Sequence, residues 1–145
     1  MSTWDFSMLP VVMDRYARGF HEALEGAVHI ITDTGHREIV EGTPILTGRA
    51  VDNWVVTFGH SFGGYREDGY SIGSGQGLKG KVIVEGRDEI YQWRLDTNND
   101  LYMTNNSPYI GALNDGRSSQ GGAFVERGIA AMSYRAKSIR LIKRV

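Results

Sequence analysis

"MDRYARGFHEALEGAVHII", residues 13–31, is the stretch that decides the fold. Its apolar residues recur at alternating steps of three and four positions: Met13, Tyr16, Phe20, Leu24, Ala27 and Ile31. This spacing returns to one face of an α-helix, because a helix completes a turn every ~3.6 residues. The sequence therefore predicts a long N-terminal helix with one apolar stripe.

The ends of this helix carry their own signals. Ser7 is expected to cap the first turn, where Pro10 is tolerated because its missing N–H would have no partner. Gly42 is expected to close the helix, and Pro44 disfavours a helical residue before it. Three glycines inside the helix each cost about 1 kcal/mol relative to alanine, so the helix needs packing partners.

The middle of the chain mixes strand and helix signals. A turn is expected at Thr47-Gly48, followed by a strand in "NWVVTFG", residues 53–59. Residues 59–80 hold eight glycines and predict a mobile loop that becomes ordered against a neighbour. Residues 78–93 carry two signals: the run "KVIV" favours a strand, whereas the spacing of the apolar residues favours a helix. We favour the helix.

The last third of the chain predicts a strand, a turn-rich connection and a helix. The strand is "LYMTNN", residues 101–106, and it stops before Pro108. Gly116 can end a short helical turn that follows. The final helix has this apolar stripe: Val125, Ile129, Met132, Ala136 and Ile139. Together the elements predict a single α+β domain over residues 1–145, with a small sheet packed against the N-terminal and C-terminal helices.

Composition excludes several classes of protein. Hydrophobic residues make up 41% and charged residues 23% of the chain, and the net charge is -1, which is typical of a soluble globular protein. The chain has no cysteine, so disulfides, thiolate nucleophiles and cysteine zinc sites are excluded. The apolar runs are short and the first residues lack the pattern of a secretory signal, so no membrane contact is expected.

Three patterns could carry chemistry, and each has a simpler explanation. "GQGLKGK", residues 75–81, resembles the start of a phosphate-binding loop, but Val82 stands where a magnesium-binding hydroxyl is needed. His21, His29 and His36 share a helix face at neighbour distances of about 10–12 Å, too far apart for one metal ion, so a solvated or interfacial role is expected.

The third pattern is acidic. Glu85, Asp88 and Glu89 could act as acid and base, but they fit a solvated helix face better. No G-x-S-x-G or H-E-x-x-H motif occurs in the chain. We therefore expect no enzymatic activity, no cofactor and no metal.

Charge is distributed unevenly along the chain. The first fifty residues hold seven carboxylates and four arginines, whereas no acidic residue follows Glu126. The basic residues that could face DNA are Arg135, Lys137, Arg140 and Lys143. The same cluster also fits a solvated helix face, or pairing with the acidic N-terminal part of a neighbouring subunit. A small DNA-binding module thus remains an alternative.

Two segments resemble those of the neck or tail-completion proteins of tailed bacteriophages. "LYMTNNSPYIGALNDGRSSQGGAFVERGIAA", residues 101–131, is similar to the family's Asn-Asn strand end, Pro-Tyr turn and Ser-x-Gln loop. "TPILTGRAVDNW", residues 43–54, is similar to its Thr-Gly-Arg stretch. The matching residues are Thr47, Gly48, Arg49, Asn105, Asn106, Pro108, Tyr109, Gly116, Ser118 and Gln120.

The resemblance implies a structural protein of the virion, assembled in the host cytoplasm. It implies a homo-oligomeric ring at the head–tail junction, which joins the capsid connector to the tail and contacts passing DNA without sequence specificity. Residues 105–120 and 59–80 are then expected to make assembly contacts. The sequence departs from the family pattern at Leu46, at Asn114 and at Gly121-Gly122, which affects the details of those contacts.

Overall fold

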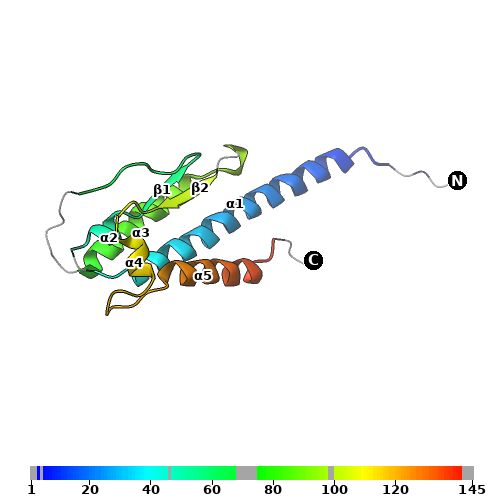
Figure 1. Ribbon diagram of the computed structural model, residues 1–145. Coiled ribbons are helices and arrows are strands. Elements are labelled where there is room, and N and C mark those ends of the chain that lie inside the picture. The colour runs from blue at the N-terminus through cyan, green and yellow to red at the C-terminus, as the bar shows by residue number, and fades with distance from the viewer. Residues whose placement is uncertain (1–2, 4, 46, 68–74, 98–99, 142–145) are drawn as a thin grey trace.

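The computed structural model describes residues 3, 5–45, 47–67, 75–97 and 100–141 (Figure 1). It is a mixed α+β structure, as predicted. The elements in chain order are α1 (Leu9–Gly42), α2 (Arg49–Asp52), β1 (Val55–Phe58), α3 (Gly75–Gln92), the 3-10 helix η1 (Leu95–Thr97), β2 (Leu101–Thr104), α4 (Ile110–Asn114) and α5 (Phe124–Ser138).

Helix α1 is 34 residues long and ends at Gly42, as predicted. The expected Ser7 cap is wrong: Met8 is the N-cap residue, without a side-chain cap, and the Ser7 N–H donates to the Asp5 carboxylate instead. At the other end, the ammonium group of the buried Lys79 donates to the carbonyl of Glu41. A positive charge there is favourable because the last carbonyls of a helix carry a partial negative charge.

The sheet has two antiparallel strands, β1 and β2, with Val55 opposite Thr104 and Phe58 opposite Leu101. Helix α3 lies between these strands in sequence and packs against both β1 and α1. The helical interpretation of residues 78–93 is thus confirmed, and the strand alternative is wrong. The buried face of this segment contains Ile83, Gly86, Ile90 and Trp93, as the spacing predicts.

The predicted glycine loop is shorter than expected, because residues 75–80 belong to α3. The "GQGLKGK" segment is accordingly helical and is not a phosphate-binding loop. Residues 59–67 have no regular secondary structure, and the remainder of the predicted loop, residues 68–74, lies outside the described residues.

The core lies where the second half of α1 meets α2, α3, α4 and α5. Its buried residues are Ile39, Val40, Ala50, Val51, Trp54, Val82, Ile83, Leu113 and Phe124. The Trp54 indole N–H donates to Thr43 Oγ1 at 2.9 Å, and the ring meets Phe124 edge-on at 6.4 Å. Trp54 therefore buries its aromatic surface without leaving its donor unpaired.

Glycines bring α5 close to α1. A Cβ atom added to Gly128 of α5 would lie 2.3 Å from Ile39 Cγ1, and one added to Gly35 of α1 would lie 2.3 Å from the Met132 side chain. The buried face of α5 contains Phe124 and Gly128, whereas Ile129 is 59% exposed and Ala136 is also exposed. The apolar stripe that the sequence predicts for α5 therefore lies to one side of the face that α5 buries.

Another glycine brings α3 close to α1. A Cβ atom on Gly86 would lie 2.2 Å from the imidazole ring of His36. His36 is fully buried, and neither ring nitrogen has a hydrogen-bond partner among the described residues. Burial lowers the pKa of His36 to about 4, against the opposing charge of Asp33. The neutral ring therefore packs as a flat core side chain.

Substitution of Gly86 by alanine tests this contact. We expect Gly86→Ala to destabilise the protein by about 1–3 kcal/mol, because the added methyl group must displace a buried ring. Gly80→Ala, in the same helix, is the matched control: nothing lies within 4 Å of its added Cβ, and it should stabilise by up to ~1 kcal/mol. Urea unfolding of both variants measures the difference. Equal effects would contradict the packing described here.

The pKa of His36 also predicts how stability depends on pH. The unfolded chain binds a proton on this histidine below a pH of about 6.5, whereas the folded chain does so only near pH 4. The contribution of the neutral His36 ring to the free energy of unfolding is therefore fully present above pH 6.5. It is lost as the pH falls from there towards 4. We expect that contribution to be on the order of 3 kcal/mol. Urea unfolding of wild type and His36→Leu should show a steeper loss for wild type across this pH window.

Candidate assembly surfaces

The two segments that carry the family resemblance lie next to each other. Thr47 and Arg49 from the first segment and Tyr109 from the second line the same pocket, which has a volume of about 240 Å³ and also contains Pro44, Ala50 and Leu113. The Asn105 amide donates to the carbonyl of Ala50 at 2.7 Å and joins the segments directly. The fold thus places both motifs at one location although more than fifty residues separate them.

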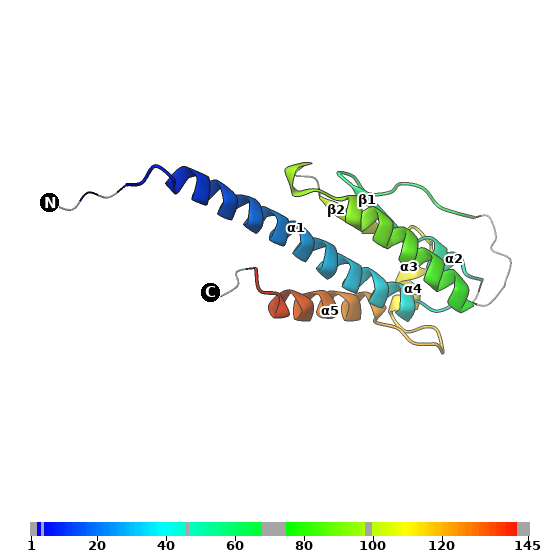
Figure 2. The same cartoon turned by 180° about the vertical axis from the view of Figure 1, so that it is seen from behind.

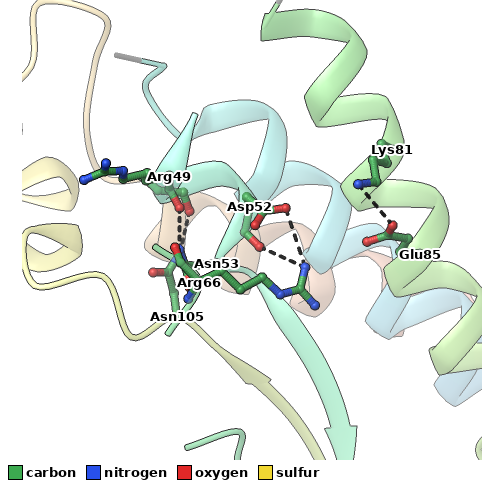
Figure 3. Close-up of polar contacts among 8 residues, drawn as sticks. Arg49, Asp52, Asn53, Arg66, Lys81, Glu85 and Asn105 are labelled. Atoms are coloured by element: carbon green, nitrogen blue, oxygen red, sulfur yellow. Dashed lines mark hydrogen bonds and ion pairs between the residues drawn. The ribbon is translucent and has the colours of Figure 1, made fainter. Parts of the chain in front are cut away.

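The first segment forms the turn into α2. Gly48 has φ 82°, in the left-handed region that favours glycine, and is the N-cap residue of α2. Thr47 Oγ1 accepts a long hydrogen bond, 3.4 Å, from the Arg49 N–H. The side chain of Arg49 is directed away from the neighbouring polar groups (Figure 3), and the residue is exposed. Thr47 and Arg49 are therefore the exposed members of this motif, and Gly48 is buried.

The two asparagines fix the chain around the end of β2. Asn105 Oδ1 accepts from the Ser107 N–H at 3.0 Å. The Asn106 amide donates to the carbonyls of Phe62 and Gly64, at 2.7 and 2.8 Å. Asn106 thereby holds the irregular segment after β1 beside the end of β2.

Asn53 was not singled out by the sequence, yet it holds the same irregular segment from the other side. Its amide oxygen accepts from the Arg66 N–H at 2.8 Å, and its amide nitrogen donates to the Arg66 carbonyl at 3.0 Å (Figure 3). The residue is 1% exposed. A polar residue at the start of the predicted strand was the available signal, since such a residue has to find partners once it is buried.

Asp52 was also missed. It is 1% exposed, neither carboxylate oxygen has a hydrogen bond among the described residues, and Arg66 Nη1 lies 3.5 Å from Oδ1 (Figure 3). A buried carboxylate is costly without an opposite charge. Arg66 supplies that charge, so the irregular segment is tied to the core by Asp52 as well as Asn53.

Gln120 joins the loop before α5 to the segment after α1. Its Oε1 accepts from the Ile45 N–H at 2.8 Å, and its Nε2 donates to the Ile45 carbonyl at 2.6 Å. Ser118 Oγ accepts from the Gln120 N–H, and Gly116 makes the turn out of α4 with φ 89°. Pro108, in the preceding turn, is exposed.

Asn114, at the end of α4, accepts a hydrogen bond from a backbone N–H in the first turn of α5. Its Oδ1 accepts from the Val125 N–H at 3.0 Å, and its Nδ2 donates to the Glu126 carboxylate. The second contact lowers the pKa of Glu126. The side-chain amides of the motif segments are thus bonded within the chain, and they fix the shape of the surface there.

The basic residues of the C-terminal region are placed for contact with solvent or a partner. Arg135, Lys137 and Arg140 are exposed along the end of α5 and just after it. Lys143 lies outside the described residues.

The histidines differ from expectation. His29 and His36 are 7% and 0% exposed, so a solvated role is wrong for both, and the His29 Nε2–H donates to the Trp93 carbonyl at 2.7 Å. His21 pairs with Asp96 at 2.9 Å. Within the described ranges, no three His, Asp or Glu side chains come close enough together to hold a metal ion.

The acidic residues of α3 lie on its solvent-facing side. They are Glu85, Asp88 and Glu89, and all three are exposed. Lys81 forms an i, i+4 pair with Glu85 at 3.7 Å (Figure 3). This arrangement is that of an ordinary solvated helix face.

The first half of α1 projects beyond the rest of the fold (Figures 1 and 2). The predicted apolar stripe is covered only in the second half of the helix. The exposed residues on that face, here called the stripe, are Leu9 (48%), Val12 (43%), Met13 (63%), Tyr16 (71%) and Phe20 (46%). No element of the described part of the chain covers them.

An apolar groove lies between the sheet and the helices. It has a volume of about 570 Å³. Its walls come from Thr32 and Ile39 of α1, residues 101–104 of β2, Ile110 of α4, and the α5 residues Val125, Ile129 and Met132, with Trp54 and Val56 also contributing. Most of this surface is apolar, and Ile129 on α5 is its most exposed side chain.

The chain was compared with known families, curated proteins and solved structures. No family model, curated protein or solved structure matches the chain. Within the described residues, no helix combines the length and apolar character needed to cross a lipid bilayer.

Replacement of Gln120 tests whether it acts within the subunit. Gln120→Ala removes two hydrogen bonds to the Ile45 backbone, so we expect a loss of about 1–3 kcal/mol in the free energy of unfolding. Ser119→Ala, at the neighbouring exposed position, is the control and should change stability by less than ~0.5 kcal/mol. Urea unfolding measures both. A fully stable Gln120→Ala protein would show that the residue does not hold the loop.

Proposed function

We propose that this protein is a structural subunit of a tailed bacteriophage, which forms a homo-oligomeric ring at the head–tail junction and joins the capsid connector to the tail. In this role genomic DNA passes through the ring. The observation that carries the proposal is the stripe, an apolar surface on a helix that extends away from the folded body.

The stripe is comparable in area to the largest apolar patch on a typical monomer, and such patches are often functional. Taking about 150–200 Å² for each large side chain, its five residues leave roughly 400–550 Å² of side-chain surface in water. Phe6 and Met8, just before the helix, are 69% and 63% exposed and extend this surface. Contiguous apolar patches of several hundred Å² mark sites of contact with other proteins or membranes. A structural subunit that is completed by its neighbours accounts for such a surface.

The order of elements supports the same role. A long helix, a Thr-Gly-Arg turn, a strand, an irregular segment, a helix, an Asn-Asn strand and a basic final helix follow one another, as the resemblance implies. The uneven charge is compatible with ring formation, because the N-terminal part of the chain is acidic and the exposed end of α5 is basic. Head-to-tail contacts between unlike surfaces can close into a ring.

Measurement of mass and shape tests the proposal. The purified protein should show a concentration-dependent rise in mass by light scattering, up to a fixed multiple of the subunit, and electron microscopy should show rings with a central channel. A protein that stays monomeric at every concentration, and forms no rings, contradicts the proposal.

A small DNA-binding module is the second candidate. Arg135, Lys137 and Arg140 are exposed, and none of them forms an ion pair with the described residues, which leaves their charges available to phosphates. This function would show as DNA binding by a monomer or dimer whose affinity falls steeply with salt. Rings that form without DNA would favour the first candidate.

A further inference from the structure

We propose that the stripe of one subunit lies in the groove of the next, so that every copy contributes one helix and receives one. This inference rests on the proposed ring and identifies the surfaces that would form it.

The stripe has the spacing of a helix that binds in a groove. Leu9, Val12, Met13, Tyr16 and Phe20 occupy positions i, i+3, i+4, i+7 and i+11 of one helix. Helices that bind in apolar grooves use anchors at i, i+3, i+4 and i+7. None of these five side chains is needed for the core of its own subunit, since each is at least 43% exposed.

The groove is apolar, as is the stripe. Trp54, Ile110, Val125 and Met132 form apolar walls, and Ile129 on α5 is 59% exposed. Its volume of about 570 Å³ lies within the ~300–1,000 Å³ range of pockets that bury a bound group. One or two large apolar side chains of the stripe can therefore enter it.

The stripe cannot reach the groove of its own subunit. Helix α1 contributes Thr32 and Ile39 to the groove, and Phe20 precedes Thr32 by twelve residues, about 18 Å along the helix axis. The helix is continuous from Leu9 to Gly42, so the first half cannot fold back (Figure 2). A second copy is the occupant that supplies the same stripe to every groove.

The charges agree with this pairing. Residues 5–25 carry four carboxylates (Asp5, Asp14, Glu22, Glu25) and two arginines (Arg15, Arg18), an excess of two negative charges. From Glu126 to Arg140, the charged residues are one carboxylate and four cations: Glu126, Arg127, Arg135, Lys137 and Arg140. Because α5 forms a wall of the groove, an incoming helix meets a region of opposite net charge.

The contact area favours a closed assembly over an isolated pair. The stripe brings at most roughly 400–550 Å² of side-chain surface to one contact, which is small for a specific interface. A pair held by one such contact is weak. In a closed ring every subunit is held on two sides, so the ring is the stable form.

Cross-linking tests the contact directly, because the chain has no native cysteine. A Tyr16→Cys chain is mixed with an Ile129→Cys chain and treated with a short bismaleimide. We expect a cross-linked dimer of one chain of each kind. The matched controls are Val11→Cys, which lies on the opposite side of α1 from the stripe, and Tyr134→Cys, which lies on α5 away from the groove. Each control, paired with the other test chain, should cross-link several-fold less.

Charge insertion provides the second measurement. Tyr16→Asp and Ile129→Asp are changes at exposed positions, so both chains should keep the wild-type unfolding midpoint. Each alone should raise the concentration for half-assembly by about tenfold or more, because a charge then enters an apolar contact. Mixed together, the two chains still have one intact stripe and one intact groove, so they should form a weak 1:1 dimer at high concentration and nothing larger.

The outcomes separate this inference from the proposed function. If wild type forms rings that neither substitution affects, the inference is overturned and the ring proposal stands. If Tyr16→Cys chains cross-link to one another as well as to Ile129→Cys chains, the stripes pair symmetrically and the groove assignment is overturned. Absence of both rings and cross-links at the highest concentration overturns the two together.

Discussion

Close contact between helix backbones in the second half of α1 is the constraint on which the structure depends. Gly128 of α5 admits Ile39, Gly35 of α1 admits Met132, and Gly86 of α3 admits the ring of His36. Each contact needs a residue without a side chain, because any Cβ there would overlap a neighbour. The core therefore forms around residues 27–40 of α1, and it leaves the earlier turns of the same helix without packing partners.

Much of the fold could be predicted because its signals are local. The length of α1 follows from a sustained periodic pattern, and its end at Gly42 follows from glycine and proline chemistry. The helix at residues 78–93 was recognisable because Ile83, Gly86, Ile90 and Trp93 share one face. What could not be predicted depends on contacts between distant residues. Periodicity identifies the apolar face of α1, but α5 is too short to cover all of it. His36 was expected in solvent or at an interface, because its burial depends on Gly86, fifty residues away.

In the candidate site, too, the local signals could be predicted and the contacts between distant residues could not. The motif residues Thr47, Arg49, Asn105 and Tyr109 were identified from sequence order, and the fold brings them to one place. Their bonding was not foreseen, because a side-chain amide in a loop can serve its own backbone or a partner equally well. The glycine content of residues 59–80 suggested a loop throughout, although residues 75–80 are helical, and there Leu78 packs against the core and Lys79 is buried. Asp52 and Asn53 carried no motif, and their importance comes from burial alone.

The uninterrupted course of α1 has a mechanical consequence. A load applied at the projecting end runs along the helix axis through its own hydrogen bonds and reaches the glycine contacts as a sliding force between α1 and α5. Ile39 and Met132 interlock across those contacts, so resistance to sliding comes from steric fit more than from polar bonds that water could replace. A chain built in this way resembles a rod that is held at one end by close steric fit.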